Sequence, residues 1–577
     1  MIKHALRWSL IPARLPFFFP LLLIASSAAQ TPCEGVAAWS PCDLAFDLPP
    51  GAAATFEVQA EFRSPRFKTY RMPAFWTGKQ LLIRFTPTEP GEWIYRLSGN
   101  VAGLEGKQGA FHAADSPAPG FIHVANVHHW ATDDRKAHLW MGCIADRLGF
   151  ESAADADRRI AEIAAGKCNH IRLSVLGSAA DRARVWLKDG PNPAHFDALD
   201  RTLMAIHKRG LTADLLLAAD PDYWNGLAPD WQARERLIRY LVARYAPLNI
   251  TWHGLERWED YKDSRELLKQ IGLALKKLDP YQHPRSSAAT ITSSPLLADG
   301  WMDFIVEGSM DHQVTAVEHQ FYAVPFIEVT DAQHLWNATM DGAYPELLPG
   351  GEAIAKSWFD VLADTRHWEL EPYFDLDGGR ATALEDVEYL VYIEKPAGPI
   401  EVSVEKHGYD IYWFNPLTGV FLEQKKYKGE HYTGEAPDRS HPWVLLIARE
   451  GRKESMLKSY KFESRPVPVQ EIETNALKVP FEILDPAGDA LVARLPVKYM
   501  AKLKRETRAT RSILYLWTAE APVDGQGLRV LGTGPQGTFS IPVGIALRYP
   551  AVLTIHVSAL NANGKAYASD KVYQLNR

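Results

Sequence analysis

Asn249-Ile250-Thr251-Trp252-His253-Gly254-Leu255-Glu256 is a short apolar run that is rich in β-branched and aromatic residues and ends in a carboxylate. An amphipathic helix is predicted before it over 237–245, and a longer one after it over 267–278. A buried strand between two helices is typical of one β/α unit of a parallel barrel. Because barrel chemistry takes place at the C-terminal ends of the strands, Glu256 stands where a catalytic acid would stand.

The chain has 577 residues, which is too long for one hydrophobic core and predicts about three to five domains. Its hydrophobic fraction of 46% and charged fraction of 23% are those of ordinary globular proteins. The formal charge of −7 argues against a nucleic-acid partner. Beyond the N-terminus, no run reaches the roughly 18 apolar residues that a membrane span needs, so none is expected.

Residues 1–29 have the organisation of a secretory signal peptide. Three basic residues come first, the apolar run 15–25 follows, and Ser27-Ala28-Ala29 forms a small-residue cleavage site. Loss of the three basic residues would change the formal charge from −7 to −10. We therefore expect a secreted or periplasmic protein whose signal peptide has been cleaved.

Cysteine spacing predicts one disulfide. Cys33 and Cys42 lie nine residues apart in an exported segment outside the barrel, which favours a local bond. Cys143 and Cys168 fall near the first two barrel strands and are expected to be buried free thiols. Neither pair has metal-site spacing with histidines, so no metal or other cofactor is expected.

The pattern of apolar residues divides the chain after the signal peptide into four parts. In the first part, 55–62 alternates with a period of two, and 81–85 with 92–97 predicts a hairpin around a Pro- and Gly-containing turn. The predicted domains are an N-terminal β-sandwich at 30–116, a (β/α)8 barrel at 117–370, a β-sandwich at 371–464 and a C-terminal β-rich domain at 465–577.

The barrel assignment depends on alternating strands and helices. Helices such as 196–208 fit right-handed crossovers between parallel strands. Six strands are predicted at 139–142, 170–175, 211–217, 249–256, 303–307 and 324–329, and the other two near 285–287 and 342–344.

Three barrel motifs carry a family resemblance: Asn-His-Ile-Arg-Leu at 169–173, Arg-Tyr through Trp at 244–252, and Trp-Asn-Ala-Thr-Met-Asp-Gly at 336–342. With them, the barrel resembles the apiosidase-like group of clan A glycoside hydrolases, which are bacterial (β/α)8 enzymes that act on plant polysaccharides. Phe75-Trp76-Thr77-Gly78 and Gly91-Glu92-Trp93 resemble a bacterial N-terminal sandwich of unknown function that precedes glycosidase barrels. The motifs at 413–419 and 441–446 resemble the C-terminal sandwich of that group, a module labelled collagen-binding.

The resemblance implies two catalytic carboxyl groups, one from strand four and one from strand seven. By strand count these are Glu256, the general acid/base, and Glu328, the nucleophile of a retaining enzyme. Glu259 and Asp260 compete with Glu256 for the first role. Glu307 and Asp331 compete for the second.

Two departures from the family pattern bear on these roles. Clan A enzymes often place Asn before the acid/base, and here the residue is Leu255. The Gly- and Tyr-rich loop expected after strand seven is missing, because Asp331-Ala332-Gln333 leads straight into a helix. A purely structural Glu256 would cap a helix or pair with Arg257 or Arg172.

Further residues are candidates for substrate binding, although an ordinary packing role is the alternative for each. Arg172, at the end of strand two, would keep the nucleophile ionised. The flat faces of Trp224, Trp252 and Trp258 could stack on sugar rings. Side chains that could bond sugar hydroxyls are those of His253, His312 and Tyr322.

The sequence thus predicts a secreted, retaining glycoside hydrolase that acts on plant or microbial polysaccharide or oligosaccharide. The missing loop favours an alternative, a catalytically inactive barrel that acts as a carbohydrate-binding or surface-adhesion protein. Binding to a collagen-like protein rests only on the module label. The sugar, the linkage and the oligomeric state stay open.

Overall fold

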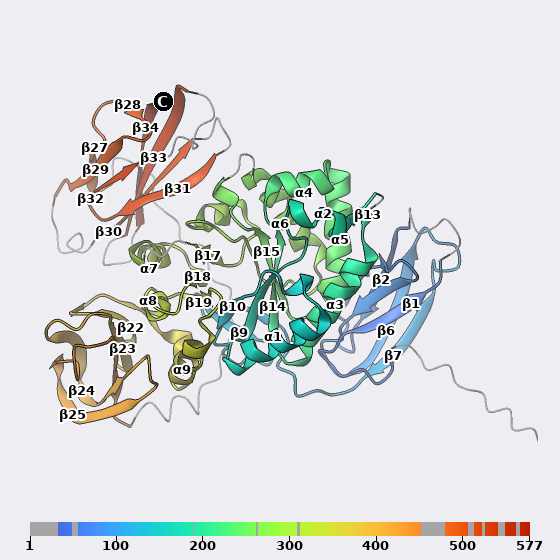
Figure 1. Cartoon of the computed structure of the whole chain (residues 1–577), viewed down its shortest axis with the longest axis horizontal. Helices are drawn as coiled ribbons and strands as arrows, with labels where there is room; N and C mark the ends of the chain where they lie inside the picture. Colours follow the sequence, from blue (N-terminus) through green and yellow to red (C-terminus); the bar gives the residue numbers. More distant parts are fainter. Residues whose placement is uncertain are drawn as a thin grey trace, which may run out of the picture.

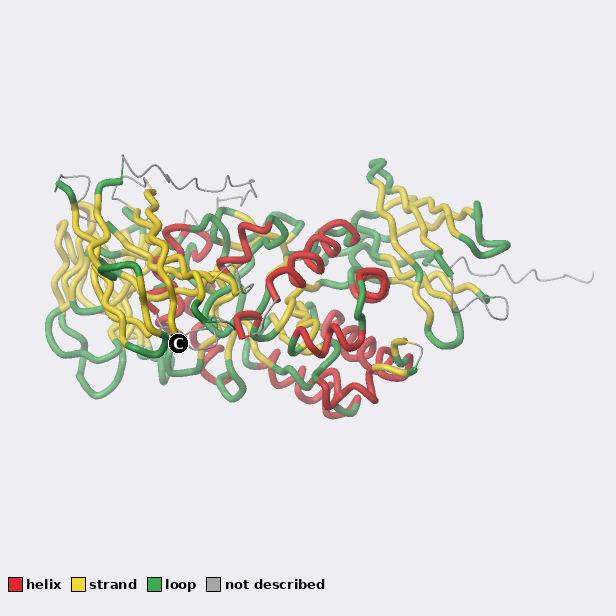
Figure 2. Tube along the Cα trace, turned by 90° about the horizontal axis from the view of Figure 1, so that it is seen from above, coloured by secondary structure: helices red, strands yellow, loops and turns green. Residues whose placement is uncertain are grey.

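In the computed structural model, a central barrel carries β-rich domains on both sides (Figure 1). Seen from above, helices surround the strands in the middle of the molecule, and both ends consist of strands and loops (Figure 2). The structure describes residues 33–48, 56–188, 190–260, 264–308, 312–451, 479–505, 513–521, 526–540, 549–560 and 566–577. The predicted signal peptide at 1–29 lies outside these residues, and the predicted domain boundaries stay predictions.

The N-terminal domain is a β-sandwich, as predicted. One sheet has the order β1-β5-β4 and the other β3-β2-β6-β7. Alternate residues of β2 face the core, where Phe62 stacks on Phe85 with ring centroids 3.8 Å apart. The strands are β1 (Cys42–Phe46), β2 (Val58–Arg63), β3 (Thr69–Pro73), β4 (Phe75–Trp76), β5 (Leu81–Phe85), β6 (Gly91–Gly99) and β7 (Gln108–Ala113).

The hairpin predicted between 81–85 and 92–97 is wrong, although both strands exist. β5 pairs with β1 and β4, whereas β6 pairs with β2 and β7, so the two strands belong to different sheets. The connection passes from one sheet to the other. Phe85 and Trp93 meet in the core between the sheets, with ring centroids 5.1 Å apart. The turn residues mark a change of sheet instead of a tight hairpin.

The central sheet has eight parallel strands and is nearly closed into a barrel, which confirms the predicted fold class. Its order is β16-β15-β14-β11-β10-β19-β18-β17. Hydrogen bonds join the two end strands, because Asp303 N donates to Arg285 O and Ser286 Oγ donates to Phe304 O, each at 2.8 Å. The strands are β10 (Gly142–Ile144), β11 (His170–Ser174), β14 (Thr212–Ala218), β15 (Ile250–Leu255), β16 (Arg285–Ser286), β17 (Ile305–Glu307), β18 (Phe326–Thr330) and β19 (Tyr344–Leu347).

Helices cover the outer face of this sheet (Figure 1). Side-chain caps fix several of their starts: Asn192 accepts from the N–H of Ala194 at α3, and Asp230 from that of Ala233 at α5. A short ribbon of β12 (Trp186–Leu187) and β13 (Gly190–Pro191) precedes α3. The helices are α1 (Ala153–Ala165), α2 (Arg182–Val185), α3 (Pro193–Lys208), α4 (Pro221–Leu227), α5 (Trp231–Tyr245), α6 (Ser264–Leu278), α7 (His312–Phe321), α8 (Leu335–Met340) and α9 (Glu352–Ala363).

A hairpin of β8 (Ile122–Ala125) and β9 (His129–Thr132) covers the N-terminal end of the barrel. Trp130 packs on Trp140 and Phe304 with ring centroids 4.8 and 5.3 Å away. His129 Nδ1 lies 2.8 Å from the hydroxyl of Tyr344, at the start of β19. The hairpin does not cover the opposite end of the barrel, which holds the C-terminal ends of the strands. A functional site is therefore expected at that end.

The region after the barrel is sandwich-like. Six of its strands have the order β20-β22-β23-β26-β24-β21, and β25 pairs with β24. One side encloses its own core, and the other packs on the barrel, where Trp336 of α8 lies near the rings of Tyr392 and Phe414. The strands are β20 (Glu371–Tyr373), β21 (Leu376–Asp377), β22 (Arg380–Leu384), β23 (Glu388–Ile393), β24 (Ile400–Phe414), β25 (Phe421–Gly434) and β26 (Trp443–Arg449).

The C-terminal part packs two sheets, β27-β29-β32 and β28-β34-β33-β30-β31, around a separate core. It contacts the barrel at α7, where Phe321 packs with Leu516 and Leu560. The strands are β27 (Phe481–Asp485), β28 (Ala490–Val492), β29 (Pro496–Leu503), β30 (Leu514–Ala521), β31 (Gln526–Thr533), β32 (Gln536–Ser540), β33 (Ala551–Leu560) and β34 (Ala566–Asn576). Among the helices described, none is long and apolar enough to cross a membrane.

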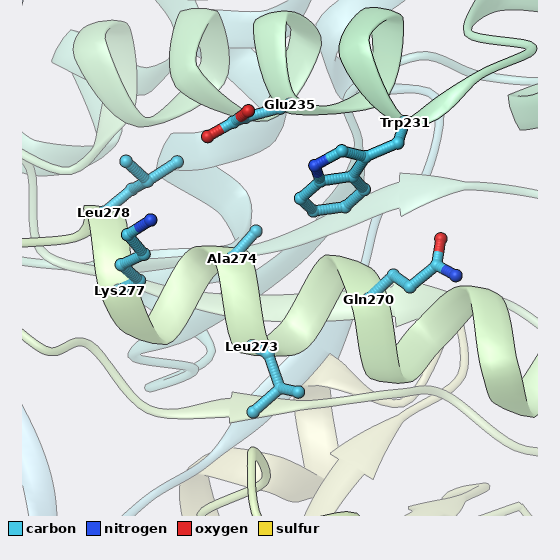
Figure 3. Close-up of a pocket in the computed structure, with 7 residues that line it drawn as sticks. All are labelled: Trp231, Glu235, Gln270, Leu273, Ala274, Lys277 and Leu278. Atoms are coloured by element: carbon cyan, nitrogen blue, oxygen red, sulfur yellow. The ribbon is translucent and has the colours of Figure 1, made fainter.

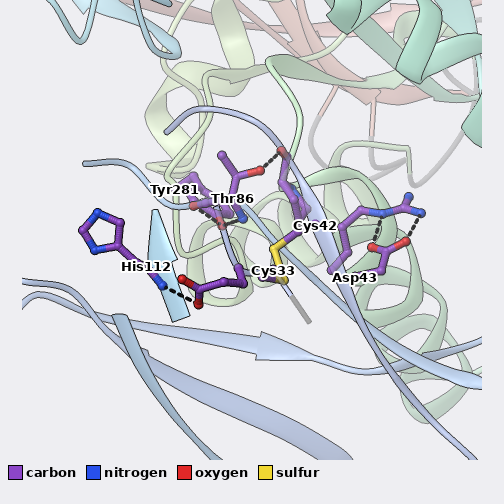
Figure 4. The surroundings of a disulfide bond; sticks show 9 residues. Cys33, Cys42, Asp43, Thr86, His112 and Tyr281 are labelled. Atoms are coloured by element: carbon purple, nitrogen blue, oxygen red, sulfur yellow. Dashed lines mark hydrogen bonds and ion pairs between the residues drawn. A yellow bond between two sulfur atoms is a disulfide. The ribbon is translucent and has the colours of Figure 1, made fainter. Parts of the chain in front are cut away.

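All four cysteines are bonded. Cys33 pairs with Cys42 as predicted, with Cα atoms 5.5 Å apart (Figure 4). Cys143 and Cys168 are buried in the barrel core as expected, but the prediction that they are free thiols is wrong. The chain folds back after α1 so that Cys168, just before β11, comes beside Cys143 of the adjacent β10. Their Cα separation of 6.0 Å suits a disulfide.

The N-terminal sandwich docks on the barrel through buried polar contacts. The Arg84 guanidinium donates to Asp43 Oδ1 at 2.9 Å, to Asp200 Oδ2 of α3 at 3.1 Å and to the backbone oxygen of Arg244 at 3.1 Å. Beside it, the Tyr281 hydroxyl accepts from Thr86 N at 2.8 Å and donates to Thr86 O at 3.0 Å (Figure 4). A nearly fully buried arginine thus links the two domains.

We expect Arg84→Ala to destabilise the protein by about 3 kcal/mol, because it leaves Asp43 without its buried cation and Asp200 with Arg244 alone. The measurement is thermal unfolding followed by intrinsic fluorescence. Arg71→Ala is the matched control, since Arg71 pairs with Glu61 on the exposed face of the same sandwich and its loss should cost no more than about 0.5 kcal/mol. Equal melting temperatures for the two variants would contradict the assigned role of Arg84.

Candidate active site at the C-terminal end of the barrel

Arg172, on β11, is the cation around which the acidic groups of the barrel gather. Its Nη1 donates to Glu346 Oε2 at 2.9 Å, and its Nε and Nη2 donate to the two oxygens of Asp146, each at 3.2 Å. Burial alone would lower the pKa of the guanidinium. The charges of Glu346, Asp146 and Glu256 outweigh that effect and raise it.

Strand register shows which of these side chains face the barrel interior. Neighbouring residues in register on parallel strands point to the same side, and successive residues alternate. Glu346 pairs with Gly142, which pairs with His170, and Arg172 pairs with Asp214. His170 contacts Asp214 at 3.0 Å, so this set lies inside the barrel.

Burial inside the barrel shifts the pKa values of several groups. It raises the pKa of Glu346 to about 7, because Arg172 offsets only part of the cost of desolvating the carboxylate. It likewise raises the pKa of Asp214 to about 6 and lowers that of His253 to about 4. Near neutral pH, Glu346 can therefore gain or lose a proton beside a permanent cation.

Glu256 follows the last residue of β15, at the end of strand four where it was predicted. It is partly exposed, whereas the six strand residues before it are buried. Its negative charge contributes to the raised pKa of Arg172, which places the two groups in one electrostatic site. The structure therefore brings together two of the predicted site residues, Glu256 and Arg172.

The structure does not bring Glu328 to that site. Val329 is in register with Glu346 and Ile327 with Tyr344, so Val329 and Ile327 face the interior and Glu328 faces the helix layer. Glu328 is fully buried and in register with Glu307. The predicted nucleophile thus lies on the outer side of the sheet, one residue out of phase with the interior.

Glu307 and Glu318 form a buried carboxyl pair on that outer side. The hydroxyl oxygen of Thr292 lies within hydrogen-bond distance of both carboxyl groups, 2.9 Å from Glu307 Oε1 and 2.8 Å from Glu318 Oε2. Burial, and then the charges of Glu318 and Glu328, hold the pKa of Glu307 well above its usual range. Burial also raises the pKa of Glu318 and that of the nearby Tyr322. This arrangement accounts for Glu307 and Tyr322, which the sequence had placed at the active site.

The predicted sugar platforms are in the core. Trp224, Trp252 and Trp258 are all fully buried, so their ring faces are covered by protein. Trp252 donates its Nε1–H to Asp279 Oδ2 at 3.0 Å, and Trp258 donates to the backbone oxygen of Thr292 at 3.1 Å. His253 is buried in the barrel interior, 5.4 Å from the ring of Phe304. The side chain of His312, at the start of α7, lies outside the described part of the chain.

The alternative carboxylates have other surroundings. Glu259 is buried and accepts hydrogen bonds from three backbone N–H groups, those of Thr290, Ile291 and Thr292, at 2.9 to 3.0 Å. It therefore organises the loop after β16. Asp331 caps the turn before α8 and contacts His334 Nδ1 at 2.8 Å. The side chain of Asp260 is outside the described part.

A surface pocket of about 440 Å³ lies elsewhere, between α5 and α6 on the outer wall (Figure 3). Trp231 and Gln270 line one end of it, and Lys277 and Leu278 the other. None of the predicted catalytic or substrate-binding residues lines this pocket. Its position on the helix layer separates it from the strand ends.

Sequence reasoning missed Asp146 and Glu346. Asp146 follows the first barrel strand by two residues, which is a signal of the same kind as that of Glu256. The strand predicted near 342–344 ended before Glu346, whereas β19 runs from Tyr344 to Leu347. The position of Glu346 on this strand follows from its pairing with β18 and β10.

Comparison with known proteins supports the architecture. Residues 35–100 match a family model described as a domain of unknown function, DUF5060. This confirms the predicted N-terminal sandwich of unknown function. No curated protein matches the chain.

Solved structures with the same fold come from glycoside hydrolases. A protein from Bacteroides vulgatus ATCC 8482, described as a glycoside hydrolase candidate, has a TM-score of 0.63 at 17% identity and covers 72% of this chain and 100% of its own. A glycoside hydrolase family 5 protein from the same organism has a TM-score of 0.51 at 13% identity, covering 60% and 96%. Another glycoside hydrolase has a TM-score of 0.50 at 13% identity, covering 57% and 97%. At these identities the likeness establishes the fold.

The Glu307 and Glu318 pair generates a pH prediction. The pKa of Glu307 is higher in the native protein than in the unfolded chain, where the pKa of a glutamate is about 4.3. Glu307 therefore stays protonated to a higher pH in the native protein. The free energy of unfolding therefore falls as pH rises above that value, until the native carboxyl ionises. Glu307→Gln keeps a donor for Glu318 and removes this titration.

We expect melting temperatures measured from pH 5 to 9 to fall less steeply for Glu307→Gln than for the wild type. Glu61→Gln, on the exposed face of the N-terminal sandwich, is the control and should leave the pH dependence unchanged. Melting temperatures that fall equally steeply with pH in the wild type and in Glu307→Gln would contradict the raised pKa of Glu307.

Proposed function

We propose that this protein is a secreted glycoside hydrolase whose active site surrounds Arg172 at the C-terminal end of the barrel. The observation that carries the proposal is the set of carboxylates gathered by one guanidinium, Asp146 and Glu346 by hydrogen bonds and Glu256 by charge. Glycoside hydrolysis needs two carboxyl groups at the scissile bond. The likeness to solved glycoside hydrolase structures supports the same reaction class.

Asp146 and Glu346 differ in solvent exposure, which assigns them different roles. The Asp146 side chain is 31% exposed, whereas that of Glu346 is 0% exposed behind the guanidinium. A sugar ring can therefore approach Asp146 and Glu256 directly. Glu346 orients Arg172 from inside the barrel.

In the proposed retaining reaction, Glu256 protonates the leaving oxygen while Asp146 attacks the anomeric carbon to form a glycosyl-enzyme. Glu256 then takes a proton from water, which attacks the same carbon and releases the sugar. Arg172 holds the Asp146 carboxylate in place through two parallel hydrogen bonds.

The proposed substrate is a plant or microbial polysaccharide or oligosaccharide. The motifs shared with the apiosidase-like group support a plant polysaccharide, and the signal-like residues 1–29 support an exported enzyme. The alternative role, a non-catalytic carbohydrate-binding or adhesion protein, is favoured by the outward orientation of Glu328. The following experiment separates the two.

We expect Glu256→Ala and Asp146→Asn each to lower kcat/KM on oligosaccharides by about 10³-fold or more, since each removes a group that acts on the reacting bond. Glu256→Ala should keep more activity on 4-nitrophenyl glycosides, whose leaving groups need little protonation, and azide should accelerate it. Asp146→Asn should lose both activities. The measurement uses a panel of cell-wall oligosaccharides and 4-nitrophenyl glycosides, with the anomeric configuration of the product followed by NMR.

Glu328→Gln is the matched comparison, because it alters a carboxyl group on the outer face of the same barrel. A loss below about tenfold, about 1.4 kcal/mol, supports the register argument. Full loss in Glu328→Gln with active Asp146→Asn would restore the nucleophile predicted from sequence. A wild type that binds oligosaccharide and cleaves none would favour the non-catalytic role.

A further inference from the structure

Three histidines and a glutamate from distant parts of the sequence meet away from the proposed active site. His128 and His129 belong to the hairpin at the N-terminal end of the barrel, and His319 lies near the end of α7. Glu371 opens β20, the first strand after the barrel. The cluster thus joins the hairpin, the helix layer and the start of the second sandwich.

Ring nitrogens of the three histidines lie near the Glu371 carboxylate, at distances like those between ligands of one metal ion. His128 Nδ1 lies 3.1 Å from Glu371 Oε2, His319 Nε2 lies 3.4 Å from the same oxygen, and His129 Nε2 lies 3.5 Å from Oε1. Ligand atoms of His128, His319 and Glu371 all lie within 4.8 Å of one another. In a tetrahedral zinc site with bonds of about 2.0–2.2 Å, neighbouring ligand atoms stand about 3.3–3.6 Å apart.

Hydrogen bonds on the far side of two rings orient their lone pairs toward the carboxylate. His128 Nε2 lies 2.9 Å from the backbone oxygen of Tyr322, which can only accept, so this nitrogen carries the proton. A neutral His128 then presents a bare Nδ1 to Glu371, which is also an acceptor. His129 Nδ1 likewise contacts the Tyr344 hydroxyl at 2.8 Å, which leaves Nε2 facing Glu371. Outer hydrogen bonds of this kind are the usual support of metal-bound histidines.

His319 gives a second, independent indication. Its side chain is 1% exposed, and among the described residues neither of its ring nitrogens has a hydrogen-bond partner. A buried imidazole that has a carboxylate nearby but no hydrogen bond is costly unless a further group binds it. Gly342, with φ of +81°, lies against this ring, and a Cβ there would approach it to 2.6 Å. The backbone therefore leaves room for the ring in this position.

We propose that His128, His319 and Glu371 form a binding site for a divalent transition-metal ion such as Zn²⁺, with His129 in contact with the other oxygen of Glu371. Imidazole and carboxylate ligands suit zinc, and the Glu371 side chain is 44% exposed, which gives the ion a path of entry. The ion would join the hairpin under the barrel to α7 and β20. Its role is structural, since the site contains no residue of the proposed catalytic set.

The test is metal binding by the full-length protein. After dialysis against EDTA, the wild type should take up one equivalent of Zn²⁺ at micromolar concentration in calorimetry, and Co²⁺ should give the visible absorption of a four-coordinate site. His128→Gln and Glu371→Gln should each weaken Zn²⁺ binding by about 100-fold or more and abolish the Co²⁺ spectrum. Zn²⁺ should raise the melting temperature of the wild type and not of these variants.

His407→Gln is the control, because His407 contacts Asp386 at 2.7 Å on the second sandwich, where Asp386 also pairs with the cation of Arg449. It should bind Zn²⁺ as the wild type does. Absence of Zn²⁺ uptake by the wild type, or unchanged uptake by both His128→Gln and Glu371→Gln, would overturn the proposal. The histidines and Glu371 would then be held together by hydrogen bonds alone. The wild-type titration decides even if a variant fails to fold.

Discussion

Alternation along a closed parallel sheet assigns every strand residue to the barrel interior or to the helix layer. Charged groups that face inward must then be balanced there, because water cannot solvate them. Arg172 supplies the balancing cation, and Glu346 and Asp146 bind it from β19 and from the segment after β10. The position of the proposed active site follows from this pairing. So does the separation of the interior carboxylates from Glu307, Glu318 and Glu328 on the outer face.

Local patterns predicted most of the fold. The eight barrel strands and the helices around Glu256 were visible because a buried strand or an amphipathic helix leaves its signature within a few residues. The alternation of β2 and the disulfide between Cys33 and Cys42 are equally local. The strand predicted at 249–256 is β15, Ile250–Leu255, so Glu256 follows its last residue directly.

Features that depend on pairing between distant segments could not be predicted. Glu328 and Val329 differ by one position, yet only the register with β19 shows which of them faces inward. The same holds for β5 and β6, whose intervening turn crosses between sheets. Three tryptophans that looked like surface platforms are buried in the core. The ligands of the proposed metal site lie at 128, 319 and 371, a spacing without any motif.

One face of the sandwich that follows the barrel shares the hydrophobic core of the barrel. Leu390, Tyr392 and Phe414 belong to the same continuous cluster as the barrel strands and helices, whereas the other face of that sandwich, the N-terminal sandwich and the last domain each have a core of their own. A cut near residue 370 would open the interior of a single unit instead of separating two modules. Separated there, each part would expose to water the apolar surface that it now buries against the other.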